Sequence, residues 1–185
     1  MTKAEARKLA KARRAAVDLH AVGHAMAGVL FTLPAWRAAD MVLAFASMPD
    51  EPDTADILRQ TLAEGKRLLL PRVLSRTEMD WVEITALSQL RPGAYGILEP
   101  LASLPAFDTS TLGDGALALI PCLAASPDGV RLGRGGGYYD RFLAHYNGKR
   151  LLVCPTAALL DDLPYDGWDI RFTPHEILTE KGIFL

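Results

Sequence analysis

Four short, continuous apolar runs constrain the fold of this chain more than any other feature. They cover residues 41–46, 67–71, 116–121 and 151–155. An uninterrupted apolar run of this length is typical of a parallel strand that is covered on both faces, because a half-exposed strand would alternate polar and apolar residues. Helix-like segments separate the runs. We therefore expect an α/β domain of three layers, with a largely parallel central sheet flanked by helices.

Length and composition indicate one domain, residues 1–185, with a sizeable core, since half of the residues are hydrophobic. No apolar run approaches the roughly 20 residues that span a membrane, and the basic start lacks the apolar core of a signal peptide. The net charge of −2 argues against a general nucleic-acid coat. We expect a cytoplasmic protein without a membrane, nucleic-acid or obligate protein partner, with Cys122 and Cys154 reduced and buried.

The spacing of apolar residues over 3–33 predicts one long helix, which Pro34 ends. The helix would present one apolar stripe formed by Leu9, Ala12, Ala16, Leu19, Val22, Met26, Val29 and Leu33. Its first half is strongly basic, and Lys3 and Arg7 would share a face. That face is either simply solvated or binds a polyphosphate. His20 and His24 have a spacing that can bind metal, but without an evident third ligand we expect both to face solvent.

An acidic loop follows the first apolar run. Residues 47–54 contain two prolines and three acids, and Asp53 or Thr54 can cap a helix over 55–64 that Gly65 ends. Glu51 would then lie near the carboxyl end of a parallel strand, where ligands of open sheets gather; the alternative is an exposed loop acid. Further along, we expect Trp81 in the core, a rigid loop without strands over 90–100, and a short closing strand over 175–179.

The richest motif is residues 131–141, Arg-Leu-Gly-Arg-Gly-Gly-Gly-Tyr-Tyr-Asp-Arg. Its glycines allow a ligand to approach the backbone closely, its arginines suit phosphate or carboxylate, and its tyrosines offer stacking faces. Asp140 is an oxygen ligand that suits Mg²⁺. A strand precedes the motif and a helix over 139–146 follows it, which favours an anion site over a plain flexible turn. Neither a Walker A loop nor a dinucleotide fingerprint matches.

Across nearly its whole length the sequence resembles the 5-formyltetrahydrofolate cyclo-ligase family. Arg131 to Asp140 matches the family's Arg-Leu-Gly-x-Gly-x-Gly-Tyr-Tyr-Asp signature. Four weaker segments also resemble the family and keep its order. They are the first helix (Lys3 to Arg7 and residues 12–14), the acidic loop (47–51 and 53–54), residues 65–71, and the loop that contains Gly93 and residues 96–100.

The resemblance implies a Rossmann-like fold and an ATP-dependent, Mg²⁺-dependent cyclisation of 5-formyltetrahydrofolate, with or without a polyglutamate tail, to 5,10-methenyltetrahydrofolate. ATP would contact Lys3, Arg7, Arg131, Leu132, Gly133, Arg134, Gly135, Gly136, Gly137, Tyr138 and Tyr139. The folate would contact Ala46, Met48, Glu51, Arg134, Gly135, Gly136, Gly137 and Tyr138. Asp140 and Asp169 would serve Mg²⁺, and we expect Arg134 and Tyr138 to be the catalytic residues.

The residue chemistry suits such a reaction. Phosphorylation of the formyl oxygen creates a leaving group, so the protein has to position substrates and neutralise a phosphoryl group rather than supply a nucleophile. Two alternatives stay open. One is an ATP-dependent kinase or ligase that acts on another small substrate. The other is a non-catalytic folate- or nucleotide-binding paralogue, motivated by departures from the family pattern at Ala125, Ser126, Ala158 and Trp168.

Overall fold

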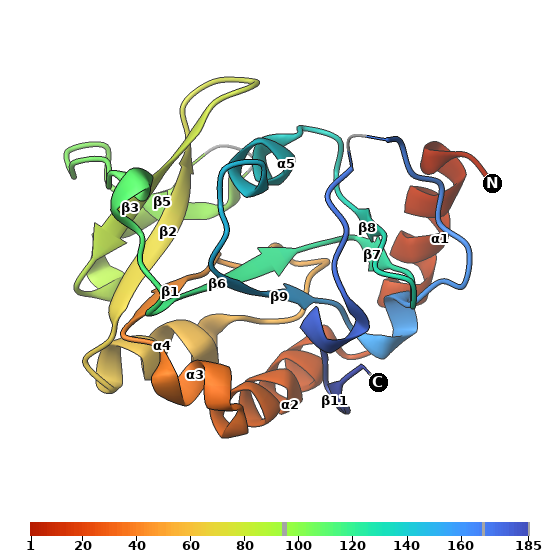
Figure 1. Cartoon of the computed structure of the whole chain (residues 1–185), viewed down its shortest axis with the longest axis horizontal. Coiled ribbons are helices and arrows are strands. Elements are labelled where there is room, and N and C mark those ends of the chain that lie inside the picture. The colour runs from red at the N-terminus through yellow and green to blue at the C-terminus, as the bar shows by residue number, and fades with distance from the viewer. Residues whose placement is uncertain (94–95, 168, 185) are drawn as a thin grey trace.

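The computed structural model describes residues 1–93, 96–167 and 169–184. Its centre is a sheet with the strand order β11-β10-β9-β6-β1-β2-β3 (Figure 1). The strands are β1 (Met41–Leu43), β2 (Arg67–Val73), β3 (Met79–Ile84), β6 (Ala116–Pro121), β9 (Lys149–Val153), β10 (Ile177–Thr179) and β11 (Gly182–Ile183). The inner pairs are parallel, and only β3 and β11 pair antiparallel at the two edges. The expected α/β class is confirmed.

The register of the sheet explains why its central strands contain continuous apolar runs. Val42 lies beside Leu68 and Leu117, whereas the next residue, Leu43, lies beside Leu69 and Ala118. Because successive side chains point to opposite faces, the first set packs in one hydrophobic cluster and the second set in another. A polar residue at either kind of position would be buried, and the sheet is therefore covered on both faces.

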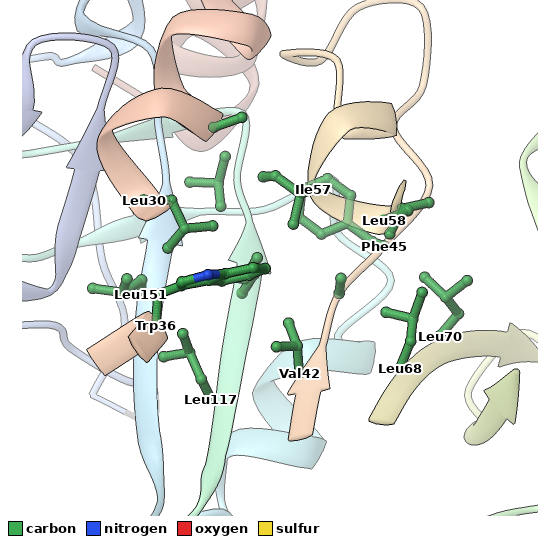
Figure 2. Packing of buried hydrophobic residues seen from close by; sticks show 14 of the residues in the cluster. Leu30, Trp36, Val42, Phe45, Ile57, Leu58, Leu68, Leu70, Leu117 and Leu151 are labelled. Atoms are coloured by element: carbon green, nitrogen blue, oxygen red, sulfur yellow. The ribbon is translucent and has the colours of Figure 1, made fainter. Parts of the chain in front are cut away.

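Helices supply the two covers. On one face lie α2 (Leu19–Thr32), α3 (Pro34–Ala38) and α4 (Ala55–Ala63), and on the other lies α5 (Tyr138–Leu143) (Figure 1). Figure 2 shows Trp36 of α3 close to Leu30 of α2 and to Leu117 and Leu151 of the sheet, and all four belong to one cluster. The three-layer arrangement follows directly from these contacts.

Two small sheets lie outside the main one. β4 (Leu90–Pro92) pairs antiparallel with β5 (Leu98–Pro100), and β7 (Ala124–Ala125) pairs with β8 (Arg131–Leu132). Short 3₁₀ turns cover 87–89, 109–111, 156–158 and 174–176. The expectation of a strandless loop over 90–100 is wrong, because Arg91 and Glu99 are partners in a hairpin whose prolines sit at its strand ends.

The expected single helix over 3–33 is also wrong. The structure contains α1 (Lys3–Ala15) and α2, which meet at an angle of 91°. Asp18 causes the break, since its carboxylate accepts hydrogen bonds from the backbone N–H groups of His20 and Ala21 and so caps a new helix. The expected stripe fails in α1, where Leu9 is 38% exposed and Ala6, Ala10 and Arg14 are buried instead.

Smaller differences concern the ends of elements. β1 ends three residues before the apolar run 41–46 does. β9 begins and ends two residues before the run 151–155. Both α4 and α5 are slightly shorter than expected, and the closing strand begins at Ile177 after a 3₁₀ turn. Pro34 begins α3. Trp81 and the free cysteines Cys122 and Cys154 are buried, as expected.

The histidines of α2 face solvent as predicted, and each contacts an acid of the following loop and helix. His20 Nδ1 lies 2.7 Å from Asp53 and His24 Nδ1 lies 2.7 Å from Asp56. In the part of the chain that the structure describes, no single helix is long and apolar enough to cross a membrane.

Candidate functional site

A cavity of about 490 Å³ opens at the carboxyl ends of the central strands. Segments far apart in sequence meet around it: the chain after β1, the β2–β3 hairpin, β5, the end of β6, one residue of α1, and the loop between β8 and α5. β1 and β6 are neighbours in the sheet, and the chain leaves them toward opposite sides of it. A crevice at such a reversal of strand order is where open parallel sheets bind ligands.

The cavity has an apolar side. It is formed by side chains from the first loop and the two hairpins, namely Phe45, Met48, Pro71, Val73, Met79, Ile97 and Leu98. Such a wall suits a flat, largely apolar ring system, since apolar burial stabilises the ligand while a few polar groups fix its orientation. Ala46 also lines the cavity, and its contact with a folate stays a prediction.

The charged side of the cavity is centred on Glu51 and Arg134. Glu51 is only 8% exposed; its Oε2 accepts from the backbone N–H of Met48 at 2.9 Å, and its Oε1 lies 3.0 Å from Arg134 Nη2. The same guanidinium lies 2.5 Å from Asp50 Oδ1. The expected place of Glu51, beyond the carboxyl end of β1, is confirmed, and its side chain is buried rather than an exposed loop acid.

The pKa of Asp50 is lowered by its contact with this arginine. Burial favours the neutral acid, but the hydrogen bond and charge of Arg134 outweigh that effect, so the pKa of Asp50 lies below its ordinary value. Through its contacts with Asp50 and Glu51, Arg134 joins the loop after β1 to the glycine-rich loop, across the cavity.

The glycine-rich loop, residues 133–137, lines the opposite side of the cavity. Gly135 and Gly137 have φ angles of +99° and +69°, which residues with a Cβ rarely adopt. Arg7 of α1 donates from Nε to the carbonyl of Gly133 at 3.0 Å. The first helix and the loop, 126 residues apart in sequence, thus lie in contact. The ATP site that the family resemblance implies for them stays a prediction.

The other members of the motif have different surroundings. Arg131 donates to the carbonyl of Pro121 at 3.2 Å and lies 2.5 Å from Asp140 Oδ1, while its buried Nε has no partner among the described residues. Leu132 is buried under α1 and does not line the cavity.

The two tyrosines of the motif differ as well. Tyr138 lines the cavity, and its hydroxyl donates to the Ser75 carbonyl at 2.7 Å. Tyr139 packs edge-on against Trp81 with ring centroids 6.2 Å apart. Burial, with a contribution from the Glu51 carboxylate, raises the pKa of Tyr139 well above its ordinary value, so its hydroxyl stays neutral. Tyr139 lines the cavity as well, so both rings contribute to its wall.

Lys3 and the expected metal ligands form ion pairs. Lys3 Nζ lies 2.7 Å from both Asp166 and Asp169, and it does not line the cavity, whereas Asp140 does. Within the described ranges, no group of three or more His, Cys, Asp or Glu side chains could hold a metal ion. Mg²⁺ in nucleotide sites often uses one or two carboxylates plus phosphate oxygens, which is the donor set that Asp140 would complete. The metal role of Asp140 and Asp169 stays a prediction.

Sequence reasoning did not select some residues that line the cavity. Glu99, 8% exposed on β5, and Lys11 of α1 both lie at its wall. Lys11 also lines a second hollow of about 320 Å³ together with Arg7, Lys8, Leu123 and Arg134. The four-residue spacing of Arg7 and Lys11 was the available signal for Lys11.

The departures from the family pattern lie in packing positions. Ala125, Ser126 and Ala158 are fully buried, and none of them lines the cavity. The Ser126 hydroxyl bonds to Asp128 and accepts from the Val130 N–H, which stabilises the turn before β8. Trp168 lies outside the described residues. These substitutions therefore leave the cavity wall intact wherever the structure describes them.

Comparison with known proteins gives a consistent result. The family model "5-formyltetrahydrofolate cyclo-ligase family" matches residues 2–180. A protein of Mycolicibacterium smegmatis named 5-formyltetrahydrofolate cyclo-ligase is 31% identical over 150 residues, covering 77% of this chain and 75% of the relative. The Escherichia coli K12 protein of the same name is 30% identical, covering 80% and 84%.

A solved structure agrees over the full length. The NMR structure of Aquifex aeolicus 5,10-methenyltetrahydrofolate synthetase superposes with a TM-score of 0.84 at 27% identity, covering 100% of this chain and 92% of that one. Together, the sequence matches and the shared fold show that the chain belongs to the 5-formyltetrahydrofolate cyclo-ligase family and is an enzyme of the ligase class.

Proposed function

We propose that the protein catalyses the ATP-dependent cyclisation of 5-formyltetrahydrofolate to 5,10-methenyltetrahydrofolate, with release of ADP and phosphate. One observation carries the proposal beyond family membership. A single cavity joins an apolar wall, a buried carboxylate and an arginine to a glycine-rich loop. A flat pterin and a triphosphate have those complementary requirements, and the reaction needs both in one place.

The two ligands use overlapping residues in this proposal. Lys3, Arg7 and the loop 131–139 hold ATP, and the Arg7 contact with Gly133 supports a shared phosphate site for helix and loop. Ala46, Met48 and Glu51 hold the pterin, together with Arg134 to Tyr138. A carboxylate such as Glu51 can bind the amino edge of a pterin through charge-assisted hydrogen bonds.

The reaction proceeds in two displacements. The formyl oxygen attacks the γ-phosphorus of ATP, the bond to the bridging oxygen breaks, and ADP leaves. The second folate nitrogen, N10, then attacks the formyl carbon, loses its proton, and phosphate departs with the former formyl oxygen. Arg134, at the junction of both sides, neutralises the transferring phosphoryl group, and Tyr138 orients the reacting folate.

Magnesium would enter this site with the triphosphate. When bound, Mg²⁺ neutralises charge on the phosphate oxygens. Asp140, which lines the cavity, is the better supported ligand, and Asp169 would follow from its family position. A cytoplasmic location and independence from an obligate protein partner complete the proposal.

The direct test follows the absorbance of the methenyl product with purified protein, 5-formyltetrahydrofolate and Mg·ATP, omitting each component in turn. Product that requires all three supports the proposed reaction. A folded protein that binds both ligands without turnover would instead indicate a non-catalytic paralogue. A protein that binds ATP but does not bind 5-formyltetrahydrofolate would indicate a different substrate.

Replacement of Glu51 tests the pterin site. Glu51→Gln keeps the size of the side chain and removes its charge, so we expect a KM for 5-formyltetrahydrofolate about tenfold or more above that of the wild type, since a charged hydrogen bond is worth about 1.5–3 kcal/mol. Glu83→Gln is the matched control, because Glu83 pairs with Arg67 in the β2–β3 hairpin and does not line the cavity. Equal KM values for both variants would contradict the assignment of Glu51.

A further inference from the structure

Arg14 is a charged side chain that lies entirely inside the protein. It is 0% exposed, and its guanidinium donates to three backbone carbonyls: Nε to Leu123 at 2.8 Å, Nη1 to Asp50 at 2.8 Å, and Nη2 to Cys122. In the described part of the chain, no carboxylate lies within ion-pair distance of it. A buried cation bound only to carbonyls is costly to retain, and its contacts therefore need an explanation.

The three carbonyls belong to the segments that form the cavity. Asp50 immediately precedes Glu51 in the loop after β1, and both of these residues contact Arg134. Cys122 lines the cavity, and Leu123 follows it where the chain leaves β6 toward β7. One guanidinium thus fixes the proposed pterin loop against the end of the strand that leads to the glycine-rich loop.

Arg14 also shares a helix with the proposed nucleotide ligands. It lies seven residues after Arg7, which is about two helical turns, so both side chains project from the same face of α1. Arg7 holds the Gly133 carbonyl, and Arg14 holds the Asp50 carbonyl. A rigid helix therefore contacts the ATP side through one arginine and the folate side through the other.

We propose that Arg14 is a positioning residue that couples the two substrate sites, so that occupancy of the nucleotide site raises the affinity of the folate site and the reverse. This inference rests on the proposed function. Arg14 touches neither substrate; it acts by keeping α1 and the Asp50–Glu51 loop in one rigid unit. By linkage, each ligand changes the affinity of the other by the same factor.

Arginine suits this role better than lysine would. Its planar fork directs separate N–H groups to carbonyls that lie in different directions, whereas an ammonium group is a compact point charge on a flexible stem. Arg14→Lys therefore retains the charge and loses the fixed geometry. Arg13→Lys is a matched control on the same helix, because Arg13 is exposed and donates to the Leu159 carbonyl, at 3.1 Å and away from the cavity.

The test measures dissociation constants of 5-formyltetrahydrofolate by calorimetry, with and without saturating Mg²⁺ and the non-hydrolysable β,γ-imido analogue of ATP. We expect the analogue to tighten folate binding at least about fivefold in the wild type and in Arg13→Lys, and less than about twofold in Arg14→Lys. Equal ratios in all three proteins, or no tightening in the wild type, would overturn the coupling role while leaving the proposed function intact. If the wild type bound neither 5-formyltetrahydrofolate nor the ATP analogue when each is supplied alone, the coupling role and the proposed function would both be overturned.

A second measurement needs no variant and covers the case in which Arg14→Lys does not fold. Hydrogen exchange of the wild type is followed with the ATP analogue alone. The proposal expects slower exchange across residues 48–54, on the folate side, as well as across α1. Protection confined to α1 and the glycine-rich loop would overturn it.

Discussion

At the scale of single residues, Asp169 shows how charge and burial compete. Burial favours its neutral form, but hydrogen bonds from Lys3 and from the backbone N–H of Asp166 outweigh burial, and the pKa of Asp169 lies below its ordinary value. A carboxyl group whose folded pKa is lowered stabilises the native state above its unfolded pKa of about 3.9. That contribution disappears as the pH falls through the folded value.

Asp169→Asn should therefore destabilise the protein in a pH-dependent way. At pH 7 we expect the free energy of unfolding to fall by about 1 kcal/mol or less, because the ion pair with Lys3 is partly exposed. The difference from the wild type should begin to shrink below about pH 4. Urea unfolding at pH 7 and pH 3 measures it, and an equal difference at both values would contradict the ionised pair.

Residue identity in the site was predictable where a motif carried it. Arg134 and Glu51 follow from a specific signature and from a loop at a strand end, and the structure brings them within 3.0 Å. Arg14 was matched only as part of a family segment, and its burial was not predicted, because a basic residue in a basic helix has the pattern of a solvated one. Glu99 was not selected either, since its burial depends on a hairpin whose Gly and Pro residues indicated a loop.

At the scale of elements, Gly23 of α2 lies directly against the backbone of the loop after β1. A Cβ at this position of α2 would lie 2.2 Å from the backbone oxygen of Asp53. The loop backbone cannot withdraw easily, because Asp53 donates its N–H to the Leu19 carbonyl of the same helix at 3.1 Å. At Gly28, on the same helix, a Cβ would have no neighbouring atom within 4 Å.

The two glycines should respond in opposite directions to alanine. Gly28→Ala should raise the free energy of unfolding by about 0.5–1 kcal/mol, because alanine has the higher helix propensity. Gly23→Ala gains the same propensity but overpacks against backbone, and we expect a net loss of at least about 1 kcal/mol. Urea unfolding of both variants provides the comparison. Stabilisation by Gly23→Ala would show that α2 and the Asp53 loop can separate without cost.

Strands were easier to predict than helix boundaries. The strands β1, β2, β6 and β9 each contain part of a continuous apolar run, which identifies them regardless of their neighbours. The division between α1 and α2 depends on one capping residue, Asp18, and the apolar spacing continues across it. Burial of Ala6 and Ala10 in α1 depends on β7, β8 and the turn at 156–158, which no local pattern reveals.

At the scale of the whole molecule, the first helix belongs to a hydrophobic cluster of its own. Ala6 and Ala10 pack with Leu123, Leu132 and Leu160, apart from the two clusters on the faces of the sheet. Small alanine side chains bury little apolar area, so we expect α1 to contribute less hydrophobic stabilisation than α2, which buries Met26 and Leu30. Local opening of α1 should therefore require less free energy than global unfolding.

Hydrogen exchange tests this expectation. Without ligand, amides of residues 3–14 should exchange faster than those of β1, β6 and β9. Saturating Mg·ATP should slow exchange across residues 3–14, since Lys3 and Arg7 would gain phosphate contacts. Unchanged exchange in this range at saturation would contradict a nucleotide role for the helix.

The contacts of Lys3 with Asp166 and Asp169 also set an order of events during synthesis. The helix is synthesised before both acids, and the second of these partners is made 166 residues after Lys3. At roughly 5–20 residues per second, α1 waits roughly 8 to 33 s for that partner. The sheet can assemble around β1, β2 and β6 in the meantime, so α1 is synthesised before these strands but completes its native contacts after them.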